Sequence, residues 1–197
     1  GVQTCALPIW EIDLNEFDDM CDVIFDIIKT TSCDEASKQM LDDILFGIAR
    51  DNECSRIVAM LLDYPEWYEL LCKKVLSTDY INAKLQFAES LKDCNGKDEI
   101  RELIFDFLQV DNEYTQRLAL QSLAYIYPDK AEEYAIDFWW RDKYKDDAYA
   151  SEYQKIVVLH VLHIIHSAEL EKYLDLADKS EYRYLKENAE EIRKIME

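Results

Sequence analysis

Glycine and proline are scarce in this sequence, each occurring only 3 times in 197 residues. Folds rich in β-strands need many turns and use both residues freely, so their scarcity favours long helices with short connections. Long apolar runs are also lacking, because none approaches the ~20 residues that a helix needs to cross a bilayer. We therefore expect an all-α protein and no membrane partner.

Paired cysteine motifs are absent as well. Apart from Cys5, five cysteines remain, and no two of them have a C-x-x-C spacing. This pattern argues against a disulfide framework or a zinc knuckle. Cys21 and Cys72 fall within apolar helical patterns, as small core residues do. A reducing cytoplasm fits this use of cysteine best, and the sequence predicts neither a metal nor a cofactor.

The motifs of common catalytic sites are missing too. The sequence contains no P-loop, no glycine-rich phosphate-binding loop, no G-x-S-x-G and no H-E-x-x-H. We therefore predict no catalytic residue and a protein that is not an enzyme.

Basic residues are far fewer than acidic ones. The chain has 22 Lys and Arg against 42 Asp and Glu, so its formal net charge is −20. Such a surface repels nucleic acids and anionic lipids and attracts basic proteins. We expect a basic protein partner and no nucleic-acid partner. The alternative is that the acidity serves only solubility.

The first nine residues, GVQTCALPI, resemble the translation of a sequencing adapter. The weaker alternative is the end of a signal peptide, which would need a basic region and a sustained apolar run. Residues 1–9 are expected to be non-native. Residues 10–197 are expected to form a single domain that is truncated at its N-terminus.

Apolar residues recur at three- and four-residue spacings along most of the chain, which is the pattern of amphipathic helices. The clearest pair is 98–109 and 112–127, which Pro128 is expected to end. Further helices are predicted at 13–29, 32–50, 54–63, 66–76, 80–92, 129–140, 149–166, 168–177 and 180–195.

These helices recur in pairs. The first helices of the pairs begin near residues 34, 66, 98, 129 and 168, and a polar insertion at 141–148 accounts for the longer last step. Near-equal steps of this size are typical of stacked helical hairpins, none of which buries its apolar face alone. The sequence therefore predicts an α-solenoid of about five antiparallel helical hairpins, with an unpaired N-terminal helix at 13–29.

The hairpin at 97–128 resembles a HEAT repeat. The resemblance is carried by Asp111 in the turn, by Arg117 six positions later, and by Arg117-x-Ala119-Leu120 at the start of the second helix. In that family the Asp and Arg form a ladder that stacks successive repeats, which the resemblance implies for Asp111 and Arg117. Over 34–196 the resemblance depends on the period, because the motif is clear in one repeat only.

Three histidines, His160, His163 and His166, follow one another at i, i+3 and i+6. On a helix they fan over only ~120°, opposite the apolar residues. The second helices of HEAT-like solenoids line the concave surface, so the resemblance implies that these histidines line a groove. Two alternatives are a metal site, for which no third ligand lies nearby in the sequence, and a pH-sensitive contact.

Aromatic residues cluster around the insertion. The adjacent Trp139 and Trp140 cannot both face one core, and Trp and Tyr commonly anchor interfaces. The alternative is that a tryptophan packs under the insertion. The predicted partner-binding residues are Trp139, Trp140, Tyr144, Tyr149, Glu152, His160, His163 and His166.

The sequence thus predicts a non-enzymatic protein–protein interaction module. It would be an acidic scaffold, or an inhibitor or immunity-type protein, that binds a basic protein on its concave face. A regulatory subunit fits the same features. The resemblance also implies an alternative, a HEAT-like DNA glycosylase that uses Trp140 with Asp137 or Asp142. The net charge disfavours this alternative, because such an enzyme must neutralise several phosphates.

Overall fold

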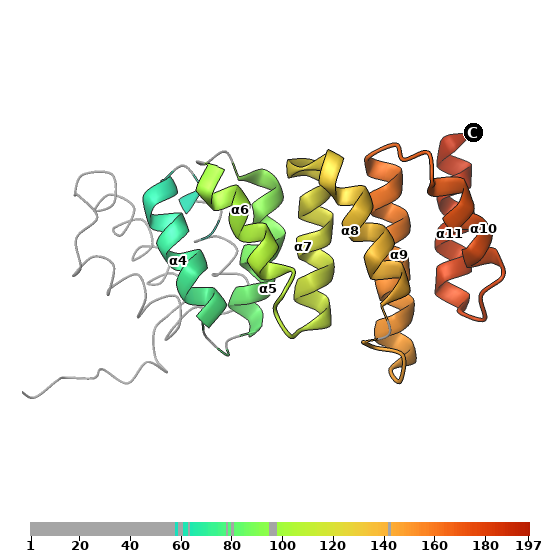
Figure 1. Ribbon diagram of the computed structural model, residues 1–197, viewed down its shortest axis with the longest axis horizontal. Coiled ribbons are helices and arrows are strands. Elements are labelled where there is room, and N and C mark those ends of the chain that lie inside the picture. Colours follow the sequence, from blue (N-terminus) through green and yellow to red (C-terminus); the bar gives the residue numbers. More distant parts are fainter. Residues whose placement is uncertain are drawn as a thin grey trace, which may run out of the picture. The chain divides into compact units, whose positions relative to one another are not determined.

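The computed structural model describes residues 58, 61–62, 64–77, 79, 81–94, 98–141 and 143–197. Within these ranges the chain forms α-helices and one short 3-10 helix, and no strand (Figure 1). The all-α prediction is therefore confirmed for the described part of the chain. The chain divides into two compact units, residues 1–86 and 87–197.

In the first unit the described residues centre on helix α4 (Pro65–Ser77). This helix buries Trp67, Tyr68, Leu71, Cys72 and Val75, which recur at the spacing of one helix face. The prediction that Cys72 is a core residue is confirmed, since its side chain is fully buried. Helix α5 (Ile81–Ser90) crosses the boundary between the two units.

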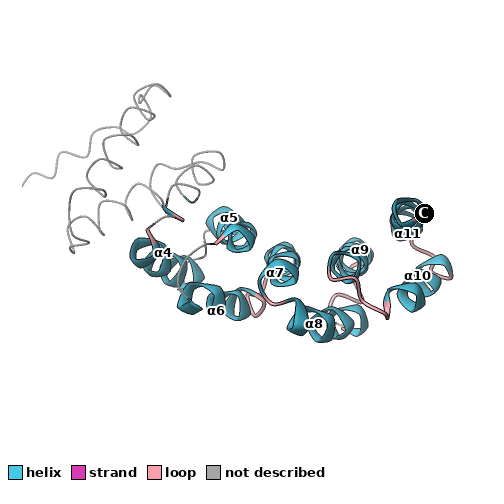
Figure 2. Cartoon of the chain, turned by 90° about the horizontal axis from the view of Figure 1, so that it is seen from above, coloured by secondary structure: helices cyan, strands magenta, loops and turns pink. Residues whose placement is uncertain are grey.

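The second unit is organised in two layers of helices. After the 3-10 helix η2 (Leu91–Asp93) come the helices α6 (Asp98–Phe107), α7 (Glu113–Ile126), α8 (Pro128–Trp140), α9 (Ala148–Ile164), α10 (Leu170–Asp178) and α11 (Arg183–Met196). Helices α6, α8 and α10 lie in one layer, and α7, α9 and α11 lie in the other, on the inner side of a curve (Figure 2). We call these the outer layer and the inner layer.

The core of this unit lies between the two layers. Ile100, Leu103 and Ile104 of α6 and the nearby Leu108 are all buried. Helix α9 is the central element, because it packs against α7, α8, α10 and α11. It therefore also buries polar side chains, those of Ser151, Glu152 and Gln154.

Both prolines in the described residues begin helices. Pro128 is expected from the sequence to end the preceding helix, but Pro65 and Pro128 are the first residues of α4 and α8. The first turn of a helix has no use for the N–H group that proline lacks, and the fixed φ of proline suits that position.

Several predicted features lie outside the described residues. They are the segment 1–9, the helices at 13–29 and 32–50, most of the helix at 54–63, and Asp142. None of the helices in the described part of the chain has the length and apolar character that crossing a bilayer requires.

Candidate functional site

The three helices of the inner layer carry a tyrosine at the same position. Helices α7, α9 and α11 begin at residues 113, 148 and 183, so each starts 35 residues after the one before. The second residue of each is Tyr114, Tyr149 or Tyr184, with exposed fractions of 48%, 62% and 49%. All three helices begin at the bottom of Figure 1, so these rings lie at one end of the inner layer.

Arg117 of α7 lies between the rings of two helices. Its guanidinium carbon is 4.7 Å from the centroid of the Tyr114 ring and 5.0 Å from that of Tyr153 on α9. The Tyr153 ring is 4.3 Å from the ring of Tyr149. Both Arg117 contacts have the distance of cation–π interactions. We call Tyr114, Arg117, Tyr149, Tyr153 and Tyr184 the tyrosine surface.

The tyrosine surface also has an electrostatic link between α9 and α11. A hydrogen bond with Tyr149 raises the pKa of the Tyr153 phenol, and the nearby Tyr184 contributes to the same rise. Tyr153 on α9 therefore lies near Tyr149 on the same helix and near Tyr184 on α11.

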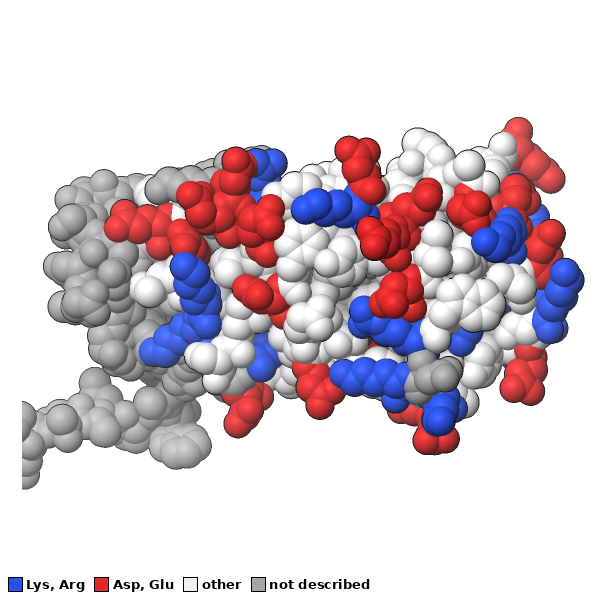
Figure 3. Space-filling view, viewed as in Figure 1, with Lys and Arg blue, Asp and Glu red and all other residues white. Residues whose placement is uncertain are grey.

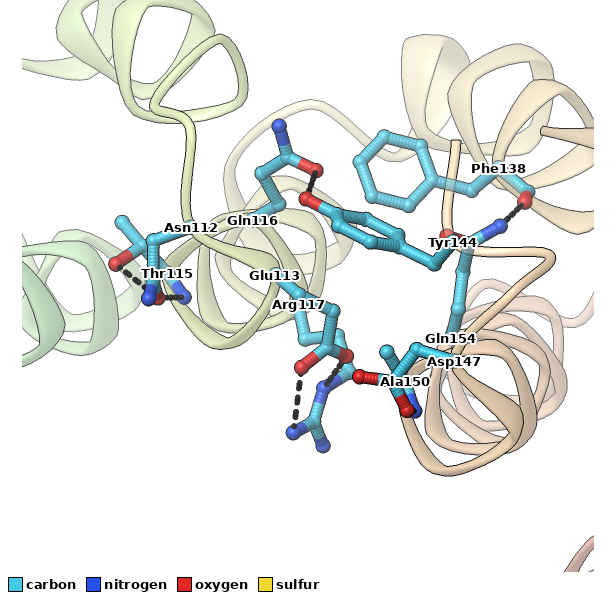
Figure 4. A network of polar contacts seen from close by, with 10 residues as sticks. All are labelled: Asn112, Glu113, Thr115, Gln116, Arg117, Phe138, Tyr144, Asp147, Ala150 and Gln154. Carbon is cyan, nitrogen blue, oxygen red and sulfur yellow. Dashed lines mark hydrogen bonds and ion pairs between the residues drawn. The ribbon is translucent and has the colours of Figure 1, made fainter. Parts of the chain in front are cut away.

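An ion pair with Glu113 holds Arg117 in place. Arg117 Nη2 donates to Glu113 Oε2 at 3.2 Å, and Arg117 Nε pairs with Glu113 Oε1 (Figure 4). Both side chains are only 16% exposed. This burial raises the pKa of Glu113, although the positive charge of Arg117 opposes the rise. A guanidinium held in this way loses little conformational freedom when a partner binds.

The predicted ladder between Asp111 and Arg117 is wrong. Arg117 pairs with Glu113, four residues earlier on its own helix, where the geometry of an α-helix places a neighbour. Asp111 Oδ1 instead pairs with Lys143 Nζ at 2.7 Å, which lowers the pKa of Asp111. Asp111 therefore links the α6–α7 turn to the α8–α9 loop through a different partner.

Side-chain caps set the first turns of α7 and α9. Asn112 Oδ1 accepts a hydrogen bond from the Thr115 N–H at 2.9 Å. Asp147 Oδ1 accepts one from the Ala150 N–H at 3.0 Å. Each cap satisfies a backbone donor that the helix itself leaves free. The caps thereby fix the two helix ends that present Tyr114 and Tyr149.

Buried glutamines connect these helices to their neighbours (Figure 4). Gln116 Nε2 donates to the Val110 carbonyl at 2.8 Å, and Gln116 Oε1 accepts from the Tyr144 hydroxyl at 3.2 Å. Gln154 Nε2 donates to the Phe138 carbonyl. Tyr144, predicted to contact a partner, therefore ties the α8–α9 loop to α7.

Glu152 was also predicted to bind a partner, and the structure contradicts this. Its side chain is buried, and its Oε1 accepts a hydrogen bond from the Leu185 N–H at 3.1 Å, in the first turn of α11. A carboxylate at this place satisfies a free N–H group and favours the positive end of the helix dipole. Glu152 thus joins α9 to α11.

The two tryptophans have different environments, as their adjacency predicts. Trp139 is 4% exposed and packs edge-on against Tyr173, with 5.0 Å between ring centroids. It belongs to the core, so its predicted contact with a partner is wrong. Trp140 is 61% exposed, and its Nε1 donates to the Tyr173 hydroxyl at 3.3 Å. Because Trp140 lies on α8, it belongs to the outer layer and not to the tyrosine surface.

The three histidines lie at the other end of α9. His160 is 11 residues beyond Tyr149, which is about 16 Å along a helix. His160 Nε2 is 3.0 Å from Asn188 Oδ1 of α11. The ring centroids of His163 and His166 are 6.4 Å apart. Within the described residues there is no group of three His, Cys, Asp or Glu side chains that could hold a metal ion.

His166 terminates α9 instead of extending it. Its φ of 53° is left-handed, the His166 N–H donates to the His163 carbonyl at 3.1 Å, and the Ser167 N–H donates to the Leu162 carbonyl at 2.9 Å. This is a Schellman motif, in which glycine is the usual residue. The helix therefore ends at Ile164, two residues before the predicted end.

The arrangement expected for the glycosylase alternative is not assembled. Asp137 Oδ2 pairs with Arg141 Nη2 at 2.7 Å, and Asp137 lines a pocket between α6 and α8 that Trp140 does not line. Asp142 lies outside the described residues.

Of the predicted residues, only Tyr149 and Arg117 belong to the tyrosine surface, and Arg117 was expected to have a structural role. Sequence reasoning missed Tyr114, Tyr153 and Tyr184. The recurrence of tyrosine at 114, 149 and 184 was visible in the sequence. The period between the first helices of the pairs does not reveal it, because the tyrosines follow the second helices.

Comparisons of the chain with models of protein families, with curated proteins and with solved structures found no match. The resemblance to HEAT repeats therefore stays a prediction that depends on the residues of this chain.

Proposed function

We propose that this protein is a protein–protein interaction module that binds a basic protein partner through the tyrosine surface. The observation that carries the proposal is the repeated position of Tyr114, Tyr149 and Tyr184 on three adjacent helices, with Arg117 held between the rings of Tyr114 and Tyr153. Tyrosine and arginine are enriched among the residues that contribute most to binding energy at interfaces. The net charge of −20 favours a basic partner.

The surroundings of the tyrosine surface support binding with little loss of entropy. Side-chain caps fix the starts of α7 and α9, and Glu113 holds Arg117. A tyrosine side chain has only two torsion angles to order, so exposed rings on rigid helix ends bind at a small conformational cost.

For the whole chain we propose a HEAT-like α-solenoid. The two layers of residues 87–197 and the 35-residue steps between the starts of α7, α9 and α11 support this architecture. In such a solenoid the tyrosine surface would lie on the concave side, where a scaffold or an inhibitor grips its partner.

A capture experiment with matched variants tests the proposal. The wild-type chain, the Tyr149→Ala/Tyr184→Ala variant and a Tyr125→Ala control would each be immobilised and exposed to a lysate at low and at high salt. Tyr125 is also an exposed tyrosine of the inner layer, but it lies at the other end of α7. We expect a basic protein that the wild type and the control retain and the double variant loses.

Salt should weaken this retention, because charge attraction contributes to it. Retention that is equal for all three proteins would contradict a role for the tyrosine surface. Clear binding of duplex DNA in a gel-shift at low salt would contradict the proposal more broadly and favour the glycosylase alternative.

A further inference from the structure

The outer layer contains a pocket that the proposed function does not use. It has a volume of about 500 Å³ and lies between α6 and α8, lined by Glu102, Phe105, Lys130, Glu133, Tyr134 and Asp137. This volume is within the range of ligand-binding pockets. Figure 3 views the side on which α6 and α8 lie and shows several acidic side chains gathered there, with fewer basic ones among them.

Part of the pocket wall is aromatic and is formed by Phe105 and Tyr134. The Phe105 ring is stacked on the ring of Tyr127, with 5.8 Å between centroids, and is tilted against the ring of Tyr134 at 5.7 Å. The three rings come from α6, from the residue between α7 and α8, and from α8. They form a continuous set of π-faces beside the pocket, and such faces attract cations.

One cation of the chain itself already uses these faces. Lys130 Nζ lies 4.9 Å from the centroid of the Phe105 ring and 5.1 Å from that of Tyr127. Lys130 is exposed and lines the pocket. The aromatic wall is therefore shaped to accept an alkylammonium group.

The carboxylates of the pocket outnumber its lysine. Glu102 Oε1 accepts a hydrogen bond from the Tyr127 hydroxyl at 2.6 Å, and Asp137 pairs with Arg141. Among the residues that the structure describes, no Lys or Arg nitrogen forms an ion pair with Glu133. Glu133 is thus a carboxylate that a second cation can pair with.

We propose that the α6–α8 pocket binds the ammonium group of a lysine side chain from a basic protein, held between the aromatic wall and Glu133. The attraction of a chain of net charge −20 for basic proteins argues for this occupant. Lys130 competes for the same aromatic faces, so the incoming ammonium displaces it. The pocket and the tyrosine surface lie in different layers of the second unit, and the proposal does not depend on the function of the tyrosine surface.

Fluorescence anisotropy of a labelled octalysine peptide, added to the full chain at low salt, tests the proposal with single-charge variants. Lys130→Gln removes the internal competitor and should tighten binding by about two- to fivefold. Glu133→Gln removes the free carboxylate and should weaken binding by about two- to fivefold. Lys194→Gln and Glu190→Gln make the same charge changes at exposed positions of α11, outside the pocket, and serve as controls.

Tyr134→Leu removes an aromatic face without a change of charge and should weaken binding by a similar factor, with folding checked by circular dichroism. If Lys130→Gln matches Lys194→Gln and Glu133→Gln matches Glu190→Gln, the peptide senses only the net charge, and the pocket proposal is wrong. Tyr125→Ala, at an exposed tyrosine that lies in neither site, should leave octalysine binding unchanged, so every variant of this test lies outside the tyrosine surface. Failure of the pocket proposal therefore leaves the tyrosine surface to be judged by its own capture experiment.

Discussion

The two ends of α9 contain similar numbers of candidate binding residues, but the contacts of these residues differ. At its first turns, Tyr153 contacts Tyr149 and Arg117 of α7 and lies near Tyr184 of α11, so three helices contribute to one surface. At its last turns, His160 bonds to Asn188, and His166 ends the helix. A row of residues along one helix is therefore weaker support for a binding surface than one position repeated on neighbouring helices.

The largest loss of stability is expected when Arg117, at the tyrosine end of α9, is replaced. Arg117→Ala leaves the half-buried Glu113 carboxylate without its partner, and we expect a loss of ~1–3 kcal/mol in the free energy of unfolding. Urea denaturation measures this loss. The exposed Lys130→Ala variant should change the same quantity by less than ~0.5 kcal/mol. Equal effects of the two variants would show that the Glu113–Arg117 pair does not hold this end of α7 and α9.

The next largest loss of stability is expected when the link between α9 and α11 is broken. Glu152→Ala removes the acceptor of the Leu185 N–H, and we expect a loss of ~1–2 kcal/mol, as for a lost helix cap. Glu190→Ala, an exposed carboxylate on α11, is the control and should have little effect. If thermal denaturation gives the two variants the same midpoint, Glu152 does not position the helix that carries Tyr184.

The pKa values of two carboxylates near the start of α7, those of Glu113 and Asp111, are shifted in opposite directions. Burial raises the pKa of Glu113 above its ordinary value of 4.5, whereas Lys143 lowers the pKa of Asp111 below its ordinary value of 3.8. Side-chain carboxyl NMR should therefore show Glu113 titrating at the higher pH. Lys143→Gln should return Asp111 towards its ordinary value and leave Glu113 unchanged. The reverse order of titration would contradict the assignment of these two ion pairs.

The same shifts predict opposite contributions to stability as the pH changes. Because the folded state binds the Glu113 proton more tightly than the unfolded state, this group stabilises the fold at low pH, and the contribution falls as the pH rises from 4.5 through the raised value. The Asp111 contribution is present above 3.8 and is lost as the pH falls through the lowered value. Unfolding of Glu113→Gln and Lys143→Gln measured against pH separates the two.

The smallest change in the free energy of unfolding is expected at the end of α9 that carries the histidines. His166 holds a φ of 53°, which costs a residue with a Cβ atom about 1 kcal/mol. His166→Gly should therefore raise the free energy of unfolding by up to ~1 kcal/mol. His166→Ala, which keeps the Cβ atom, should not. A loss of stability in His166→Gly would show that the histidine ring contributes more than its backbone conformation costs.

The helices could be predicted closely from the sequence. The boundaries expected for α6, α8 and α11 lie within three residues of those observed, because apolar periodicity and capping residues act within a few turns of chain. The role of Pro128 could not be assigned from the sequence, because this residue fits both the end of one helix and the start of the next. In the structure α7 ends at Ile126 and α8 begins at Pro128, so the proline starts the second of these helices.

The candidate site was predictable only in part. Tyr149 was identified as a partner-binding residue, but Glu152, Trp139 and Tyr144 make contacts within the fold. Each of these partners lies on another helix or loop, 28 to 34 residues away in the sequence. The helical pattern shows that a residue faces a neighbour, but it does not show which polar group the neighbour presents.

The sequence by itself determined the all-α character of the described residues, the places of the helices and the return of tyrosine at 114, 149 and 184. These properties are local, because each depends on the spacing of residues along one helix. Only the tertiary structure decided that Asp111 pairs with Lys143, and that Trp140 is exposed while Trp139 is buried. Those outcomes depend on the distances between side chains of the packed helices, and the spacing along one helix does not contain them.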